Sequence, residues 1–318
     1  MINYILKIMS FFSGAAYRFN RGCRYTESQN NSAALAEYTK AIELQPNIAK
    51  FYNRRGLTYM VLNEFSSALA DFDKGVELQP NDAAFYNHRG MIYVEMKDYT
   101  KALAEHTQAI KIQPGNADNI YNRGLAYIGL NDSTSAITDF SKAISLKNDS
   151  RFYNNRGGAY VIMGNYQSAL SDYTKAITLQ PTSVTAYINR GYTYEKLSNS
   201  DSALSDFTKA IDLDPENKLP YDGRATTYIN LQGYQMAIDD YARIVDLDSN
   251  DDDPIYNIAC VYVIQKQTKE TCKWLRKAIQ MSAENCILAK TDIDFYGIRD
   301  TVEFQALLNE FENKVHEK

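Results

Sequence analysis

The sequence contains little of what metal, redox and nucleotide sites are built from. Its 318 residues include three histidines and four cysteines, and no two cysteines stand at CxxC spacing. A GxxxxGK loop, an HExxH helix and a GxGxxG after a strand are all missing from it. We therefore predict a protein that is not an enzyme, with no catalytic residues, no metal and no cofactor, whose cysteines are free thiols.

An excess of positive charge is also lacking. The chain has 34 Lys and Arg against 39 Asp and Glu, which gives a formal net charge of −5. Nucleic acids and anionic membranes require a basic face, so this balance argues against both as partners. The acidic stretch from Asp246 to Asp253 lacks the central glycine and the closing glutamate of a calcium-binding loop. We interpret it as a solvated loop.

Long apolar runs are missing too, since a helix that spans a membrane takes about 20 apolar residues. The nearest candidate is residues 1–14, MINYILKIMSFFSG, which Lys7 interrupts. Two interpretations stay open. The segment is either a cap on the first structural unit of a cytoplasmic protein, or a signal peptide of an exported one with a small-x-small cleavage site at Ser13-Gly14-Ala15. No basic residue precedes the apolar run, which disfavours the signal.

What the chain does contain is a repeated unit of 34 residues, seen most clearly from Ser150 to Ser183. The glycine of its Asn-Arg-Gly recurs as Gly22, Gly56, Gly90, Gly124, Gly157 and Gly191, and then as Ala225 and Ala259. Every step is 34 residues except the one after Gly124, which is 33. A fixed period of this size indicates one solenoid in place of the two domains that length alone suggests.

The columns of the repeat predict two packed helices in each unit. A tyrosine follows each glycine by three residues, and small residues follow it by 12 and by 19 in most repeats. A ring follows by 16, as Tyr38, Phe72, Phe140, Tyr173, Phe207 and Tyr241, with His106 and Leu275 as the exceptions. Small residues let two helices approach closely while rings fill the gaps between them. Apolar spacing of three and four residues marks each half as an amphipathic helix, and a proline commonly ends the second.

This set of columns resembles the tetratricopeptide repeat (TPR), a helix-turn-helix unit of 34 residues. The resemblance covers about residues 15–285, in eight repeats. It implies an all-α fold, a right-handed α-solenoid of TPR units. Residues 286–318 resemble the capping tail of many bacterial TPR proteins, so we expect a bacterial source and a last helix capped by Asp300 or Thr301 that runs towards Val315.

An arginine precedes the glycine in seven repeats, where the family usually has leucine, and an acid always stands 16 residues after it. The pairs are Arg21/Glu37, Arg55/Asp71, Arg89/Glu105, Arg123/Asp139, Arg156/Asp172, Arg190/Asp206 and Arg224/Asp240. Repeat eight loses both members together, as Ile258 and Trp274. Because an unpaired, partly buried charge is costly, this joint loss predicts structural ion pairs between the two helices of each repeat.

The candidate ligand-binding residues lie two places before the glycine, or three places before it in repeats two and three. They are Asn20, Asn53, Arg54, Asn87, His88, Asn122, Asn155, Asn189 and Asn257. The resemblance places this column on the concave face, as in TPR proteins whose asparagine ladder grips a peptide backbone. A carboxamide both donates and accepts, so it pairs with a peptide unit of any sequence. The alternative is that these amides bridge neighbouring helices.

The resemblance implies a scaffold or adaptor that binds a protein or peptide partner in the concave groove. Apolar residues three and six places further on, from Leu57 and Met60 to Val161, would form its floor, with polar character returning at Glu195. The alternative function is structural, a solenoid that self-associates into homo-oligomers and has no groove ligand.

Overall fold

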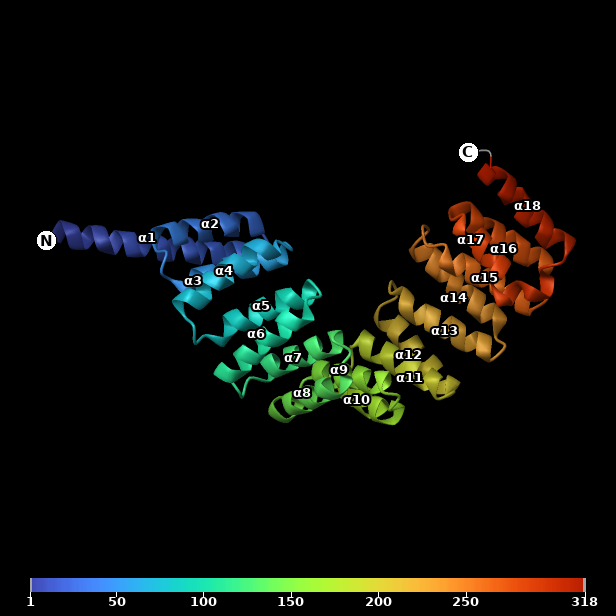
Figure 1. The fold of residues 1–318 in the computed structure, drawn as a ribbon, viewed down its shortest axis with the longest axis horizontal. Helices are drawn as coiled ribbons and strands as arrows, with labels where there is room; N and C mark the ends of the chain where they lie inside the picture. The colour runs from blue at the N-terminus through green and yellow to red at the C-terminus, as the bar shows by residue number, and fades with distance from the viewer. Residues whose placement is uncertain (1, 317–318) are drawn as a thin grey trace. The chain divides into compact units, whose positions relative to one another are not determined.

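The structure is a computed structural model, and it describes the backbone of residues 2–316 and the side chains of residues 14–311. The chain divides into two compact units, residues 1–163 and 164–318 (Figure 1). The helices of the first unit are α1 (Ile2–Glu27), α2 (Asn31–Leu44), α3 (Ala49–Val61), α4 (Phe65–Leu78), α5 (Ala83–Glu95), α6 (Tyr99–Ile112), α7 (Ala117–Gly129), α8 (Ser133–Leu146) and α9 (Ser150–Ile162). Helices α1 to α8 form consecutive antiparallel hairpins.

The second unit continues the same pattern and ends in a different arrangement. Its helices are α10 (Tyr166–Leu179), α11 (Val184–Lys196), α12 (Ser200–Leu213), α13 (Lys218–Asn230), α14 (Tyr234–Leu247), α15 (Asp253–Ile264), α16 (Thr268–Met281), α17 (Glu284–Thr291), the 3₁₀ helix η1 (Ile293–Ile298) and α18 (Val302–His316). No strand occurs in the part of the chain that the structure describes. The predicted all-α solenoid of helix pairs is confirmed.

Each hairpin turns through a residue in the left-handed region, seven places after the glycine column. Glycine provides it only at Gly164, with φ of +73°. Elsewhere the position is occupied by Gln29, Asn63, Lys97, Asn131, Ser198, Gln232 and Lys266. In those seven turns the next residue donates its N–H to the carbonyl of the column tyrosine, as Asn199 does to Tyr194 at 2.9 Å. This is the bond of a Schellman turn, which satisfies the last carbonyls of the first helix.

The glycine column exists because the ring of the second helix packs directly on the backbone of the first. A Cβ built on Gly124 would lie 2.6 Å from Cε1 of Phe140, and a Cβ on Gly191 would lie 2.8 Å from Cε1 of Phe207. Both rings are fully buried. A larger residue at Gly124 or Gly191 would force the two helices of the hairpin apart, since cores tolerate little overpacking.

Five of the seven predicted ion pairs form with at least two hydrogen bonds each. The guanidinium of Arg190 donates from Nε and Nη2 to the two carboxylate oxygens of Asp206, both at 2.7 Å. The corresponding bonds join Arg55/Asp71, Arg89/Glu105, Arg123/Asp139 and Arg224/Asp240. The paired acids Asp71, Asp139, Asp206 and Asp240 are buried. Two parallel charge-assisted hydrogen bonds make this the strongest geometry for such a pair.

The pairing of Arg156 with Asp172 stays a prediction, because the two residues belong to different units. Two features of the arginine column differ from the expectation. In repeat one, Arg18 makes the close contact with Glu37 at 3.1 Å, while Arg21 lies 3.9 Å away. The second difference is an additional contact from the arginine Nη1.

That Nη1 contact reaches the preceding hairpin. Arg55, Arg190 and Arg224 donate from Nη1 to a threonine on the second helix of the repeat before, at 3.0–3.1 Å. Arg156 donates to Ser141 in the same way, and Arg89 donates to Asp73. The guanidinium therefore joins three helices, two in its own repeat and one in its neighbour.

The ends of the chain extend the repeats differently. Residues 2–14 are the beginning of α1 and continue into the first helix of repeat one. The side chains of residues 1–13 lie outside the described residues, so the cap and the signal peptide stay predictions. At the other end, Thr301 Oγ1 accepts from the backbone N–H of Phe304 at 3.4 Å at the start of α18, as predicted. Among the described residues, no helix combines the length and hydropathy needed to cross a membrane.

Candidate functional site

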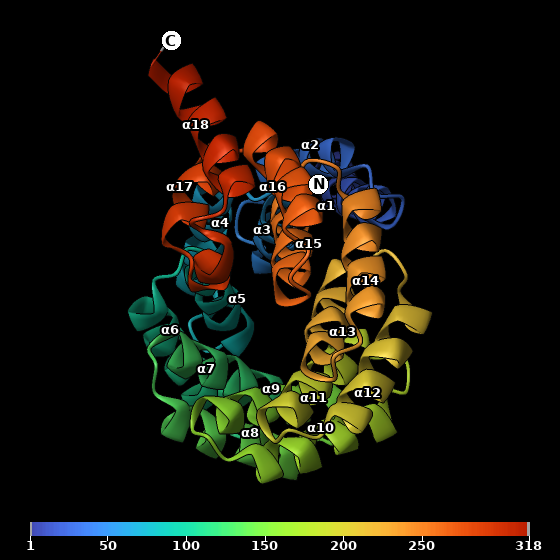
Figure 2. The ribbon, with the colours of Figure 1, turned by 90° about the vertical axis from the view of Figure 1, so that its right-hand side faces the viewer.

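The first helices of the repeats form a common surface in each unit. In unit 1, α3 contacts α5 and α5 contacts α7, so these helices lie next to one another along one side. Figure 2 shows α5 and α7 on this side and α6 and α8 on the other. In unit 2, α11 contacts α13 in the same way. We call this the A-helix face, formed by α3, α5, α7 and α9 in unit 1 and by α11, α13 and α15 in unit 2.

Two of the predicted asparagines connect neighbouring repeats. Asn122 on α7 donates from Nδ2 to Oδ1 of Asn87 on α5 at 2.9 Å. Asn155 on α9 donates to the hydroxyl of Tyr121 on α7 at 2.9 Å, and also to the carbonyl of Arg151 in its own helix. These bonds are those expected of bridging amides. The Oδ1 atoms of Asn122 and Asn155 accept no hydrogen bond from the described residues and stay available as acceptors.

The predicted residues of repeats two and three take different positions. Asn53 lines a pocket of about 230 Å³ between α3 and α5, together with Lys50, Asp82 and Phe85. Its Oδ1 is buried and accepts no hydrogen bond from the described residues. His88 instead packs on the ring of Phe72, with centroids 5.0 Å apart. Burial lowers the pKa of His88 to about 4, so this imidazole is neutral and part of the packing between α4 and α5.

The remaining predicted residues are dispersed. Asn20 and Arg54 are exposed, on α1 and α3. Asn189 is half-buried on α11, where its backbone carbonyl accepts from the hydroxyl of Thr193 at 2.7 Å. Asn257 on α15 lines a pocket of about 600 Å³ in unit 2. The structure thus places one member of the column in each of two pockets, Asn53 in that of unit 1 and Asn257 in that of unit 2.

The floor of the A-helix face in unit 1 is apolar. Leu57 and Met60 pack from α3 against one core cluster, and Leu125 and Ile128 pack from α7 against another. Met91 on α5 is 39% exposed. Half-buried apolar side chains that surround amide acceptors are the composition expected of a surface that binds an extended segment.

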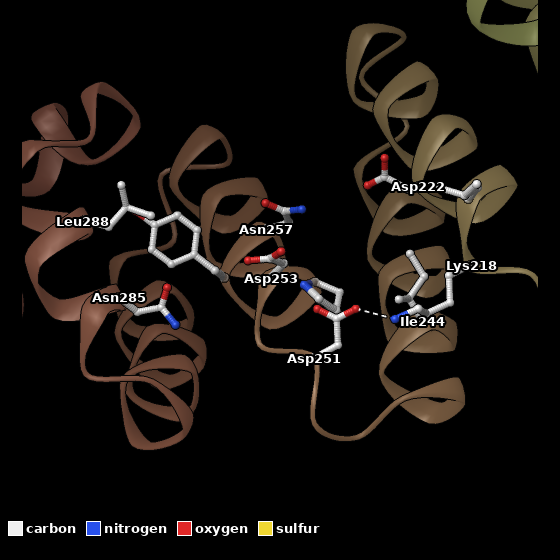
Figure 3. Close-up of a pocket in the computed structure, with 11 residues that line it drawn as sticks. Lys218, Asp222, Ile244, Asp251, Asp253, Asn257, Asn285 and Leu288 are labelled. Atoms are coloured by element: carbon white, nitrogen blue, oxygen red, sulfur yellow. Dashed lines mark hydrogen bonds and ion pairs between the residues drawn. The ribbon is translucent and has the colours of Figure 1, made fainter. Parts of the chain in front are cut away.

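In unit 2 the A-helix face is acidic. A pocket of about 600 Å³ lies between α13, α15 and α17 (Figure 3). Its wall contains Asp222, Asp251 and Asp253, together with one cation, Lys218. Lys218 Nζ donates to Asp251 at 2.7 Å and to Asp248 at 2.9 Å. Burial, followed by the charges of Asp251 and Asp253, raises the pKa of the Asp222 carboxyl.

Glu195 on α11 extends this acidic surface. Its carboxylate accepts from the hydroxyl of Thr227 at 2.6 Å. Burial is the largest influence that raises the pKa of Glu195, and the charge of Asp222 raises it further. The return of polar character that the sequence indicated near repeat six is therefore a change to negative charge.

Sequence reasoning missed most of this pocket. Asp222 stands three places before the repeat glycine position, in the column that holds Asn53 and Asn87, and that column was the available signal. The acidic stretch 246–253 was interpreted as a solvated loop, whereas Asp248 and Asp251 bind Lys218 and Asp253 lines the pocket. Asn285 comes from α17, beyond the repeats, and no periodic pattern points to it.

One group of side chains has the composition of a metal site. Cys260, Asp292 and Asp294 place their ligand atoms within 4.8 Å of one another. Burial, and then the two carboxylates, raise the pKa of the Cys260 thiol, which keeps it protonated. Tyr256 donates to Asp292 at 2.7 Å. A thiol and a phenol that share protons with two carboxylates explain this group without an ion.

Comparison with known proteins identifies the repeat. Models described as "TPR repeat" match residues 22–62 and 157–198, and models described as "Tetratricopeptide repeat" match residues 49–82, 72–104, 117–150, 184–217 and 253–285. A search of curated proteins found no match.

Many solved structures are similar. A tetratricopeptide repeat protein from Parabacteroides merdae is 17% identical, with a TM-score of 0.61 over 74% of this chain and 94% of that one. Cut9, in its complex with Hcn1, is 17% identical with a TM-score of 0.59, over 88% of this chain but 52% of the other. YrrB, described as a TPR protein with an unusual peptide-binding site, is 29% identical over 57% of this chain and 95% of that one, with a TM-score of 0.47.

Proposed function

The chain belongs to the tetratricopeptide repeat family, whose members are typically non-catalytic protein-interaction scaffolds, and from this premise we propose that it binds an extended segment of a partner protein on the A-helix face. The segment would lie across successive first helices, where backbone-directed amides and apolar contacts alternate. This role requires no cofactor, because affinity in such a groove comes from burial of apolar groups and from hydrogen bonds.

The observation that carries the proposal is the position of Asn53. Its Oδ1 is buried without a donor, beside a pocket of about 230 Å³ that opens between two first helices. A buried acceptor without a partner costs about 1–3 kcal/mol, and a backbone N–H from a bound segment would relieve that cost. The half-buried apolar residues of α3 and α7 lie on the same face and supply the nonpolar part of the contact.

A second candidate function is self-association through the C-terminal end of unit 2. Four apolar side chains there are largely exposed: Ile287 by 68%, Ile293 by 83%, Tyr296 by 74% and Val302 by 81%. Clustered exposed apolar groups favour association. A mass in solution that rises with protein concentration, and that falls to the monomer in a variant with Ile293→Ser and Val302→Ser, would support this candidate.

The test of the main proposal uses a phage library of random dodecapeptides, selected on the full chain. Recovered peptides are labelled, and their affinity is measured by fluorescence anisotropy. Met91→Glu places a charge on the face in unit 1, and Leu219→Lys does so in unit 2, where Leu219 is 58% exposed. The matched controls are Met236→Glu and Met236→Lys, on the second helix α14, where the side chain is 51% exposed.

We expect each peptide to lose affinity with one of the two A-helix variants and to keep it with the controls. Peptides that bind both A-helix variants as tightly as the wild type would place the binding surface elsewhere and refute the proposal. Failure to recover any peptide would refute it as well.

A further inference from the structure

The two units offer different chemistry on the A-helix face, and the pocket of unit 2 carries the more specific information. We propose that this pocket, between α13, α15 and α17, receives a lysine or arginine side chain of the bound segment, with Asp222 as its counter-charge. The inference rests on the proposed function and deepens it, because it states which class of segment unit 2 selects.

Asp222 is the acid that lacks a partner. Among the described residues, no side chain or backbone group makes a hydrogen bond or ion pair with its carboxylate. The cation on the same helix, Lys218, is already held by Asp248 and Asp251 at 2.9 and 2.7 Å. A half-buried carboxylate without a partner is destabilised by its loss of hydration, and a cation placed beside it would reverse that effect.

The neighbouring charges make this position more negative. Asp253 lines the same pocket, and no ion pair to it occurs in the described part of the chain. Glu195 adds a further carboxylate from α11, and the charge of Asp222 raises the pKa of that group. Complementary charge is therefore the main feature that a ligand for this pocket must provide.

Asn285 supplies an independent indication that a donor belongs here. Its side chain lines the pocket, yet the residue is only 5% exposed. Its Nδ2 donates to Asp252 and to the carbonyl of Ala278, which uses both amide protons. Its Oδ1 has no donor among the described residues, and Figure 3 shows it turned towards the space between α17 and α15. An acceptor that opens into a cavity and has no donor from the protein is satisfied by an N–H group of a ligand.

The shape and lining fit a long basic side chain better than a small cation. A volume of about 600 Å³ is far more than an ion requires, and Leu219, Tyr256 and Leu288 provide apolar walls. The methylene stem of lysine or arginine packs on such walls while its charged end reaches a carboxylate. Asn257 and Asp222 lie on opposite sides of the pocket in Figure 3, and the oxygen of Asn257 is turned towards the α17 side, so the carboxylate and the amide offer acceptors at different places to the several N–H groups of a guanidinium.

The test extends the peptide selection. Peptides that lose affinity with Leu219→Lys are those bound at unit 2, and we expect them to share a lysine or arginine at one position. Replacing that residue in the peptide, arginine by citrulline or lysine by norleucine, should weaken binding at least about tenfold, as loss of a charge-assisted hydrogen bond does. This change is made in the peptide, so it leaves the fold of the protein untouched.

The matching change in the protein is Asp222→Asn, which should produce a similar loss. Its control is Asp212→Asn, an exposed acid on α12, which should have no effect on the affinity. Unit 2 peptides that contain no basic residue, or whose affinity is unchanged by citrulline and by Asp222→Asn, would overturn this inference while the proposed function stands. If no peptide binds either unit, the proposed function fails and this inference fails with it.

Discussion

His106 occupies a position where a hydrocarbon ring would serve better, and replacing it tests our account of the core. The residue is fully buried in the aromatic column of the second helices, and neither ring nitrogen has a hydrogen-bond partner among the described residues. Burial is the main cause that lowers the pKa of His106 to about 4, and the charge of Arg123 contributes. The imidazole is thus buried, neutral and unsatisfied at neutral pH.

The space around it fits phenylalanine. A Cβ built on Gly90 would lie 2.6 Å from Cε1 of His106, the same distance that separates a Cβ on Gly124 from Cε1 of Phe140. His106→Phe should therefore raise the free energy of unfolding by about 1–3 kcal/mol at pH 7, since it removes buried polar atoms that have no partner. The converse substitution, Phe140→His, should lower the free energy of unfolding by a similar amount.

The rise in the free energy of unfolding caused by His106→Phe should depend on pH. In the unfolded chain a histidine takes up its proton near its ordinary pKa of 6.5, whereas folded His106 does so only near 4. Between these values the unfolded state binds more protons, so the stability of the wild type falls as the pH falls, by about 1.4 kcal/mol per pH unit. The advantage of His106→Phe should then grow by about 2 kcal/mol between pH 7 and pH 5.

Native-state hydrogen exchange of the amides in α5 and α6, followed at pH 5, 6, 7 and 8, measures this difference in the repeat concerned. His88 titrates in the same range and is present in both proteins, so its contribution cancels in the comparison. A variant that is less stable than the wild type at pH 7, or an advantage that does not change with pH, would refute the reasoning.

Two other pairs of substitutions test the ion pairs and the turns. Arg190→Leu should cost about 3 kcal/mol of unfolding free energy, because it leaves buried Asp206 unpaired, and adding Asp206→Leu should restore part of that loss. A double variant no more stable than the single one in urea titration would argue against direct pairing. Gly164→Ala should cost about 1–2 kcal/mol of unfolding free energy, because residue 164 has φ of +73°, whereas Ser198→Gly in the equivalent turn should be neutral or stabilising. Melting temperatures that move the other way would show that φ does not limit the stability of these turns.

The parts of the fold that could be predicted are those that lie within one repeat. Periodicity located both helices, and the constant spacing of arginine and acid located their contact, because residues 16 apart form the bidentate pair in five hairpins. The contact from Nη1 to the preceding threonine was not predictable in this way, since it depends on how one hairpin stacks on the next. The left-handed turn residues were hidden as well, because Gln29, Lys97 and Lys266 give no sign of positive φ.

The site was predicted less well, for the same reason. The asparagine column could be named from the sequence, but the bond between Asn122 and Asn87 depends on the distance between two repeats. The pocket of unit 2 combines Asp222, Asp253 and Asn285, which are separated by an intervening helix pair and a change of architecture. Such a combination has no period that a sequence pattern could reveal.

The three-helix contact of the column arginines sets a rule for how this chain can change in length. Four of these guanidiniums, those of Arg55, Arg89, Arg190 and Arg224, bind an acid in their own hairpin and a hydroxyl or a carboxylate in the hairpin before it, as Arg190 does with Asp206 and Thr174. Removing or duplicating a whole repeat gives every arginine an equivalent pair of neighbours. A deletion inside a hairpin would break both contacts at once. The one repeat of 33 residues keeps the contact within the hairpin, because the spacing from Arg123 to Asp139 is still 16 and the missing residue falls after α8.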